Sequence, residues 1–180
     1  MNNRPESSGN ADRRVLRTKK ALHAAFAELV LNRRYDEIQV GDITEDADVG
    51  RSTFYEHFRG KDDLLVQSLC AMLDVLAEAA CRVDDGIHLE GILAHFWENK
   101  SHARFLLAGP PSQHVFPLLV RELTQRIEER LPTNASSLPS RLVALRAAEG
   151  TFAVLRAWLA GEADCSPAEL AAGLRGTALD

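Results

Sequence analysis

The chain has 180 residues, of which 46% are apolar and 26% are charged, and its formal net charge at pH 7 is −5. This composition can build a core, so we expect one ordinary globular domain or a small domain joined to a larger one. The negative net charge of the whole chain argues against indiscriminate nucleic-acid binding. No run approaches the roughly 20 apolar residues of a membrane span, and the polar N-terminus lacks a secretory signal, so we expect a cytoplasmic protein.

The charges are distributed unevenly along the chain. Seven basic residues and one acid, Glu28, lie between positions 13 and 35, whereas ten basic residues face fourteen acids from Leu65 onward. A solvated surface is the ordinary interpretation of such a run. Contact with the phosphates of a nucleic acid is the alternative, if a neighbouring segment also binds nucleic acid.

The first part of the chain predicts an arm followed by a helix. Residues 1–12 are polar and cannot bury enough apolar surface to offset the entropy of ordering, so we predict a disordered arm. From Arg13 the apolar residues recur at helical spacing and several alanines raise the helix propensity, which predicts a helix that ends near Asn32. A short apolar connection follows, and a helix-turn-helix begins at Gly41.

Two pairs of apolar residues flank a tight turn in the next part of the chain. Ile43 and Ala47 lie four residues apart, and Phe54 and Phe58 repeat that spacing after the turn. Residues four apart share one helix face, so the pattern predicts a helix, a turn and a second helix that buries both phenylalanines. We therefore predict a three-helix domain with a helix-turn-helix over residues 13–60.

Beyond this domain the apolar spacing predicts only helices. We expect a long fourth helix over residues 61–81 and further helices over 89–100, 103–107, 115–131, 141–160 and 167–176. Ser166 and Glu169 form a capping box before the last helix, with proline at its first position, which is a specific start signal. The predicted fold is all-α with about nine helices, in which residues 61–180 form the larger C-terminal domain.

The helix-turn-helix carries a recognisable set of residues. They are Asp42, Ile43, Ala47 and Val49, followed by the run TFYEHFRGKDDLL over residues 53–65. This set resembles the TetR family of bacterial transcriptional regulators, over about residues 17–65, and the rest of the chain matches in layout alone. The resemblance implies a homodimer whose N-terminal domains bind a palindromic operator. It also implies that the helical C-terminal domains dimerise and bind an inducer.

The second helix of the motif is the expected DNA-reading element. Arg51 and Ser52 suit base contacts, because small or polar residues let a helix approach the major groove and arginine can bind a guanine edge through two hydrogen bonds. The resemblance implies phosphate contacts for four further residues, Thr53, Tyr55, His57 and Lys61. Four positions depart from the family pattern and point to an unusual operator: Gly41, Thr44, Asp48 and Glu56.

The C-terminal domain has two expected roles. By the resemblance, its last two helices pair with their copies in a dimer interface that contains Leu142, Leu145, Leu155, Trp158, Leu159, Leu170 and Leu174; packing within one monomer is the alternative. Its middle helices could enclose a site for a small apolar or amphipathic effector, lined by Phe96, Trp97, Arg104, Phe105, Phe116 and Phe152, although each of these also suits a core.

We expect no metal and no cofactor. His88, His95 and His102 lie seven residues apart, and each step is about 10 Å along a continuous helix, so they cannot share an ion. An enzyme is not expected either, because the chain lacks a Gly-rich phosphate loop, a Gly-x-Ser-x-Gly elbow and Cys/His metal spacing.

The leading interpretation is a repressor that binds double-stranded operator DNA as a homodimer and is released by a small-molecule effector. The alternative is a DNA-binding or protein-interaction module with a closed C-terminal core and no effector. A void between the middle helices would count against that alternative. No membrane partner is expected.

Overall fold

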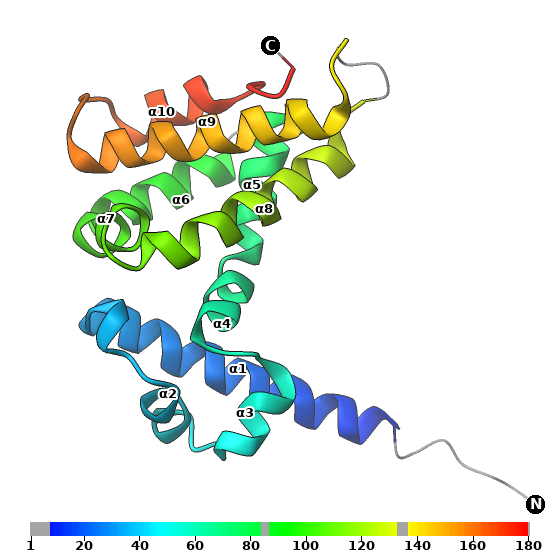
Figure 1. Cartoon of the computed structure of the whole chain (residues 1–180), viewed down its shortest axis with the longest axis vertical. Coiled ribbons are helices and arrows are strands. Elements are labelled where there is room, and N and C mark those ends of the chain that lie inside the picture. Colours follow the sequence, from blue (N-terminus) through cyan, green and yellow to red (C-terminus); the bar gives the residue numbers. More distant parts are fainter. Residues whose placement is uncertain (1–7, 84–86, 133–136, 180) are drawn as a thin grey trace, which may run out of the picture. The chain divides into compact units, whose positions relative to one another are not determined.

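The computed structural model describes residues 8–83, 87–132 and 137–179, which contain ten α-helices and one 3-10 turn and no strand (Figure 1). The predicted all-α fold is therefore confirmed. The chain divides into two compact units, Met1–Leu65 and Val66–Asp180, called here the N-terminal and the C-terminal unit. In the described part of the chain no helix is both long and apolar enough to cross a membrane.

The N-terminal unit holds the predicted three helices and a short 3-10 turn. The elements are α1 (Ser8–Asn32), the 3-10 turn Tyr35–Glu37, α2 (Val40–Asp46), α3 (Arg51–His57) and the first turn of α4 (Lys61–Ser68). Leu22, Phe26, Ile43, Phe54 and Phe58 are at most 1% exposed and form the core of the unit. All five lie at positions where the helical spacing predicts burial, so this core follows from sequence periodicity.

The first helix begins earlier than predicted. Helix α1 begins at Ser8, so residues 8–12 are helical rather than part of an arm, and residues 1–7 lie outside the described residues. The prediction that the first helix ends near Asn32 is confirmed.

The predicted fourth helix is two helices. A break at Leu69, which has φ −93° and ψ 0°, separates α4 from α5 (Cys70–Ala80), and the amide of Leu69 bonds to the carbonyl of Val66 at 3.2 Å in a tighter turn. The prediction of one helix to Cys81 is therefore wrong, because an apolar stripe continues through a local change of hydrogen bonding that side-chain spacing does not reveal. The boundary between units falls at Leu65, not at residue 60.

The C-terminal unit is a bundle of helices. After α5 come α6 (Ile87–Glu98), α7 (Lys100–Ala108), α8 (Ser112–Arg130), α9 (Ser140–Ala160) and α10 (Pro167–Leu174). Helices α8 and α9 lie side by side, α5 packs on α8, and α10 packs on α6 (Figure 1). The capping box predicted before the last helix is present, since Ser166 accepts from the Glu169 amide and the Glu169 carboxylate accepts from the Ser166 amide.

Most residues of the predicted dimer interface, on α9 and α10, are already buried within a single chain. Five of the seven predicted residues are 0–6% exposed within a single chain: Leu155, Trp158, Leu159, Leu170 and Leu174. Helix α9 packs on α7 and α8, and α10 packs on α6, so these five side chains leave little surface for a partner. For these five the burial favours the alternative of packing within one monomer, because a wide apolar stripe cannot distinguish two buried sides within one monomer from one side at an interface. Leu142 and Leu145 are 50% and 39% exposed.

Candidate nucleic-acid interface

The turn between α2 and α3 holds its predicted shape. Asp48 adopts a left-handed conformation with φ 51°, which Asp tolerates better than most residues. The amide of Val49 then bonds to the carbonyl of Thr44 at 2.9 Å, and Gly50 caps the start of α3. The turn therefore keeps its form with aspartate at this position.

Helix α3 separates a buried side from an exposed side. The rings of Phe54 and Phe58 lie 5.5 Å apart in the core. Arg51, Ser52 and Tyr55 are exposed, Tyr55 by 59%, while Thr53 and His57 are half-buried. The structure thus brings five of the six predicted DNA-contacting residues together on one short helix.

The side chain of Arg51 occupies the space beside Gly41. A Cβ atom built at position 41 would lie 2.5 Å from the Nη2 atom of Arg51, closer than non-bonded atoms approach. Gly41 stands in the first turn of α2, where the family pattern carries a larger residue. The glycine therefore leaves room for the guanidinium on the exposed side of the motif, which sequence reasoning did not foresee.

Arg59 does not neutralise the acid on the recognition helix. Its guanidinium pairs with Asp63 at 3.7 Å, four residues further along the chain, and its amide bonds to the same carboxylate at 3.0 Å. Glu56 is exposed on α3. Arg59 is thus engaged with the start of α4 rather than with Glu56.

Lys61 has its amino group bonded to backbone carbonyls. The Nζ atom donates to the carbonyls of Tyr35 and Ile38 at 2.8 Å each, with that of Asp36 at 3.5 Å, and it lies 4.6 Å from the centre of the Tyr35 ring. Burial lowers the pKa of this lysine, against the opposing effect of nearby carboxylates. A lysine has three N–H donors, so the structure gives Lys61 a role in holding the connection between α1 and α2. This differs from the phosphate contact that the resemblance implies.

Tyr35 and Asp62 complete this connection. The Tyr35 hydroxyl donates to the Asp62 carboxylate, and burial followed by this hydrogen bond raises the pKa of the tyrosine. The ring of Tyr35 meets Phe26 edge-on, with 6.3 Å between centroids. The start of α4 is thereby tied to the core of the N-terminal unit by side chains about 25 residues away in sequence.

Part of the predicted basic surface is neutralised. Arg33 pairs with Asp42 at 3.3 Å, and Arg34 pairs with Asp36 at 3.1 Å. The Gln39 amide and then Arg33 lower the pKa of Asp42. The basic residues of the first half of α1 remain exposed: Arg13, Arg14, Arg17 and Lys20. The exposed positive charge therefore gathers on α1 rather than along the whole segment.

The burial of His23 predicts that acid destabilises the N-terminal unit. Its ring meets Phe58 edge-on at 5.5 Å, and burial followed by the charge of Lys19 lowers its pKa. The histidine's contribution to stability is complete above its unfolded pKa of about 6.5 and is lost as the pH falls through the lowered folded value. We expect the N-terminal unit to lose stability between about pH 7 and pH 5.

His23→Gln should reduce this pH dependence. Hydrogen exchange of peptides from α1 and α3, followed in both proteins across the same pH range, measures the effect. An identical pH response in the two proteins would show that other groups cause it.

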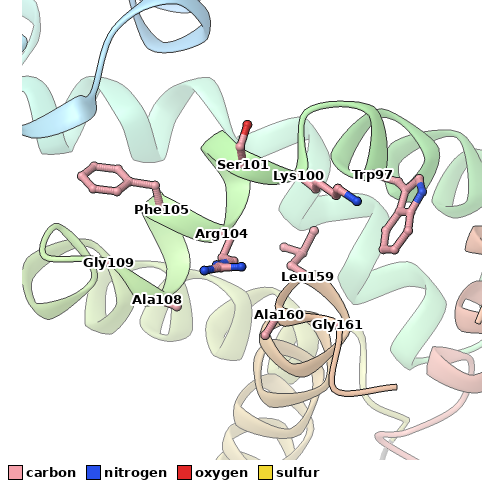
Figure 2. Close-up of a pocket in the computed structure, with 10 residues that line it drawn as sticks. All are labelled: Trp97, Lys100, Ser101, Arg104, Phe105, Ala108, Gly109, Leu159, Ala160 and Gly161. Carbon is pink, nitrogen blue, oxygen red and sulfur yellow. The ribbon is translucent and has the colours of Figure 1, made fainter. Parts of the chain in front are cut away.

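A cavity of about 600 Å³ lies in the C-terminal unit, between α7 and the end of α9 (Figure 2). Three of the predicted effector-binding residues line it, namely Trp97, Arg104 and Phe105. Phe152 is 1% exposed and packs edge-on against Phe116 at 5.6 Å, so these two belong to packing rather than to this cavity, and Phe96 does not line it either. The prediction missed Lys100, Ser101 and residues 159–161. Lys100 and Arg104 stand four apart on α7, a spacing that could have signalled a shared basic face.

The geometry defines a helix-turn-helix DNA-binding domain joined to a helical unit that contains a cavity, which is the layout of a transcriptional regulator. Residues 22–67 match the sequence model of the "Bacterial regulatory proteins, tetR family". This segment, which covers α2, α3, the C-terminal part of α1 and most of α4, is therefore a TetR-family DNA-binding domain, and the resemblance seen in the sequence is confirmed.

Two curated proteins are similar to the N-terminal part of the chain. The "Uncharacterized HTH-type transcriptional regulator YxbF" of Bacillus subtilis is 39% identical over 70 residues, which are 37% of this chain and 18% of that protein. The "HTH-type dhaKLM operon transcriptional activator DhaS" of Lactococcus lactis is 38% identical over 48 residues, 27% of this chain and 26% of that protein. The matches thus span less than a third of either relative. Both are named as regulators, and the family consists of regulatory proteins rather than enzymes.

Two solved structures share the fold over most of the chain. A TetR transcriptional regulator from Streptococcus agalactiae covers 97% of this chain and 99% of its own, with a TM-score of 0.58 and 24% identity. The "Dihydroxyacetone kinase operon activator DhaS" covers 87% of this chain and 91% of its own, with a TM-score of 0.55 and 19% identity. At this identity the likeness concerns the fold alone.

Proposed function

We propose that this chain regulates transcription by binding a palindromic operator as a homodimer, and that a small-molecule effector releases it from DNA. The observation that carries the proposal is the exposed side of α3, which presents Arg51, Ser52 and Tyr55 while Phe54 and Phe58 anchor the helix in the core. A helix held in this way can enter the major groove, which is about 12 Å wide, without disturbing its own packing. We include a cytoplasmic location in the proposal, because the operator DNA would lie there.

The contacts divide into base and phosphate contacts. Arg51 and Ser52 read base edges, and Thr53, Tyr55 and His57 fix the register through phosphates. The exposed basic residues on the first half of α1 add sequence-independent attraction. Glu56 repels phosphate wherever it faces the backbone, so we propose that it accepts a hydrogen bond from a cytosine amino group.

The homodimer forms through the exposed side of α9. Leu142 and Leu145 are half-exposed there, and they are the only two predicted interface residues with surface to offer. Two α3 helices related by a two-fold axis match half-sites one DNA turn apart, about 34–36 Å. Sedimentation of the purified protein measures the dimer directly.

The effector and the direction of regulation are separate parts of the proposal. The cavity between α7 and α9 supports an effector, and it speaks against the alternative of a closed C-terminal core. We propose repression by occupancy of the operator. The related DhaS is named as an activator, so a promoter reporter with and without the protein decides the direction.

Selection of bound sequences from random double-stranded DNA tests the function. We expect enrichment of an inverted repeat whose half-sites lie one helical turn apart, bound by two copies of the chain. Enrichment of no sequence, with binding that disappears at physiological salt, would reject a specific regulator.

Gly41→Ala should change which operator is preferred without harming the fold. The new Cβ displaces the guanidinium of Arg51, and a bidentate arginine–guanine contact is worth about 1–3 kcal/mol of base discrimination. We expect the selected sequence to change at the base pair that Arg51→Ala also affects, while thermal stability is unchanged or slightly higher.

The matched control is Gly91→Ala. Gly91 is helical in α6 with no atom within 4 Å of an added Cβ, so this variant adds the same methyl group without touching the motif. If Gly41→Ala selects the wild-type operator, the position of Arg51 beside Gly41 has no bearing on recognition.

A further inference from the structure

Two basic side chains line the cavity in the C-terminal unit, and neither forms an ion pair within the described residues. Lys100 and Arg104 both line it, and they stand one turn apart on the same side of α7. In the part of the chain that the structure describes, neither is within ion-pair distance of a carboxylate, and the first turn of α7 contains no acid. Elsewhere in the unit Arg126 does pair with a carboxylate, that of Glu122 at 2.9 Å. The cavity is thus a local excess of positive charge in a unit that is acidic overall.

The remaining walls are apolar and aromatic. Trp97 stacks on Trp158 with 4.8 Å between ring centroids, and Trp158 is held by a hydrogen bond from its Nε1 atom to the Cys165 carbonyl at 2.9 Å. Lys100 extends toward the ring of Trp97, 4.8 Å from its centre (Figure 2). Leu159 lines the opposite side. A cation over a fixed aromatic wall favours a ligand that has a charged end and an apolar body.

The end of α9 does not cancel this charge. Its C-terminal carbonyls would attract cations, but two of them already accept backbone hydrogen bonds: that of Trp158 from Gly161 at 3.0 Å, and that of Ala157 from Glu162 at 3.0 Å. Gly161 has φ 78°, the left-handed conformation that such an end requires. The carbonyl groups of Ala157 and Trp158 are therefore already engaged within the chain.

We propose that this cavity binds a small organic anion, with a carboxylate between Lys100 and Arg104 and an apolar body against Trp97 and Leu159. Its volume of about 600 Å³ lies within the roughly 300–1,000 Å³ of ligand pockets. The inference treats this cavity as the effector site of the regulator, and it therefore rests on the proposed function. It narrows the expected apolar or amphipathic effector to an amphipathic anion, because a carboxylate can accept hydrogen bonds from both Lys100 and Arg104, which line the cavity.

The chain supplies its own reporter for this site. It has two tryptophans, Trp97 and Trp158, and they are stacked on each other at the cavity. Intrinsic tryptophan fluorescence therefore reports on this site without a label. Hexanoate and benzoate are the test ligands, and hexanamide and benzamide are uncharged controls of nearly the same shape.

We expect a saturable change of fluorescence with the carboxylates and a response at least about tenfold weaker with the amides, since a hydrogen bond to a charged group is worth roughly a factor of ten in affinity. Arg104→Gln should weaken carboxylate binding by about tenfold or more. Arg121→Gln is the matched control, because Arg121 is an exposed arginine of α8 in a surface ion pair with Glu122. It should bind as the wild type does.

Three results would overturn the anion site: equal binding of amides and carboxylates, equal effects of the two arginine variants, or no saturable response to either carboxylate at millimolar concentration. If inorganic phosphate changes the fluorescence and neither carboxylate does, the claim that an apolar body of the ligand packs against Trp97 and Leu159 is wrong. All titrations are made without DNA. A protein that selects an operator but ignores carboxylates would refute the anion site and leave the regulator standing, and the reverse result would refute the regulator alone.

Discussion

Phe54→Ala should unfold the N-terminal unit and abolish operator binding. Phe54 is completely buried, its ring lies 5.5 Å from Phe58, and it anchors α3 in a unit that ends at Leu65. Removal of a buried phenylalanine costs about 3–5 kcal/mol. The free energy of unfolding of a protein domain is about 5–15 kcal/mol, so this loss is a large part of the stability of so small a unit.

Hydrogen exchange of peptides from α2 and α3 is the appropriate measurement. Both tryptophans belong to the C-terminal unit, so their fluorescence does not report on the N-terminal unit. We expect fast exchange in α2 and α3 of Phe54→Ala and unchanged exchange in α8 and α9.

Tyr55→Ala is the matched control for Phe54→Ala. Tyr55 is the next residue of the same helix and is 59% exposed. Substitutions at exposed positions usually change stability by less than about 0.5 kcal/mol, so this variant should keep wild-type exchange and lose DNA affinity. If Tyr55→Ala unfolds α3 as well, or if Phe54→Ala keeps its protection, the assignment of buried and exposed sides on this helix is wrong.

Lys61→Met should weaken the N-terminal unit and leave the salt dependence of DNA binding unchanged. Methionine keeps a stem of similar length but removes the donor to the carbonyls of Tyr35 and Ile38. Hydrogen bonds to charged groups contribute about 1.5–3 kcal/mol, and the carbonyls lose that partner. A phosphate contact would give a different result, in which stability is kept and the salt slope falls by about one ion.

Lys20→Met provides the comparison for Lys61→Met. Lys20 is exposed on α1, among the basic residues that we propose to face DNA. We expect this variant to keep its stability and to flatten the plot of affinity against salt. If the salt slope falls for Lys61→Met and not for Lys20→Met, Lys61 contacts a DNA phosphate and α1 does not.

The sequence by itself determined the parts of this protein that depend on neighbours in the chain. The four-residue spacing of Phe54 and Phe58 predicted the buried side of α3, and the capping box at Ser166 predicted the start of α10, because both depend on contacts within one helical turn. The family of the N-terminal domain was evident from a run of adjacent residues for the same reason.

Only the tertiary structure decided the contacts between distant residues. Lys61 meets carbonyls 23 to 26 positions earlier in the chain, and the cavity joins α7 to the end of α9. Hydrophobic spacing shows that a side chain is buried, but it does not show which element covers it. This is why Leu155 and Trp158 were predicted at an interface and lie in the core of their own unit.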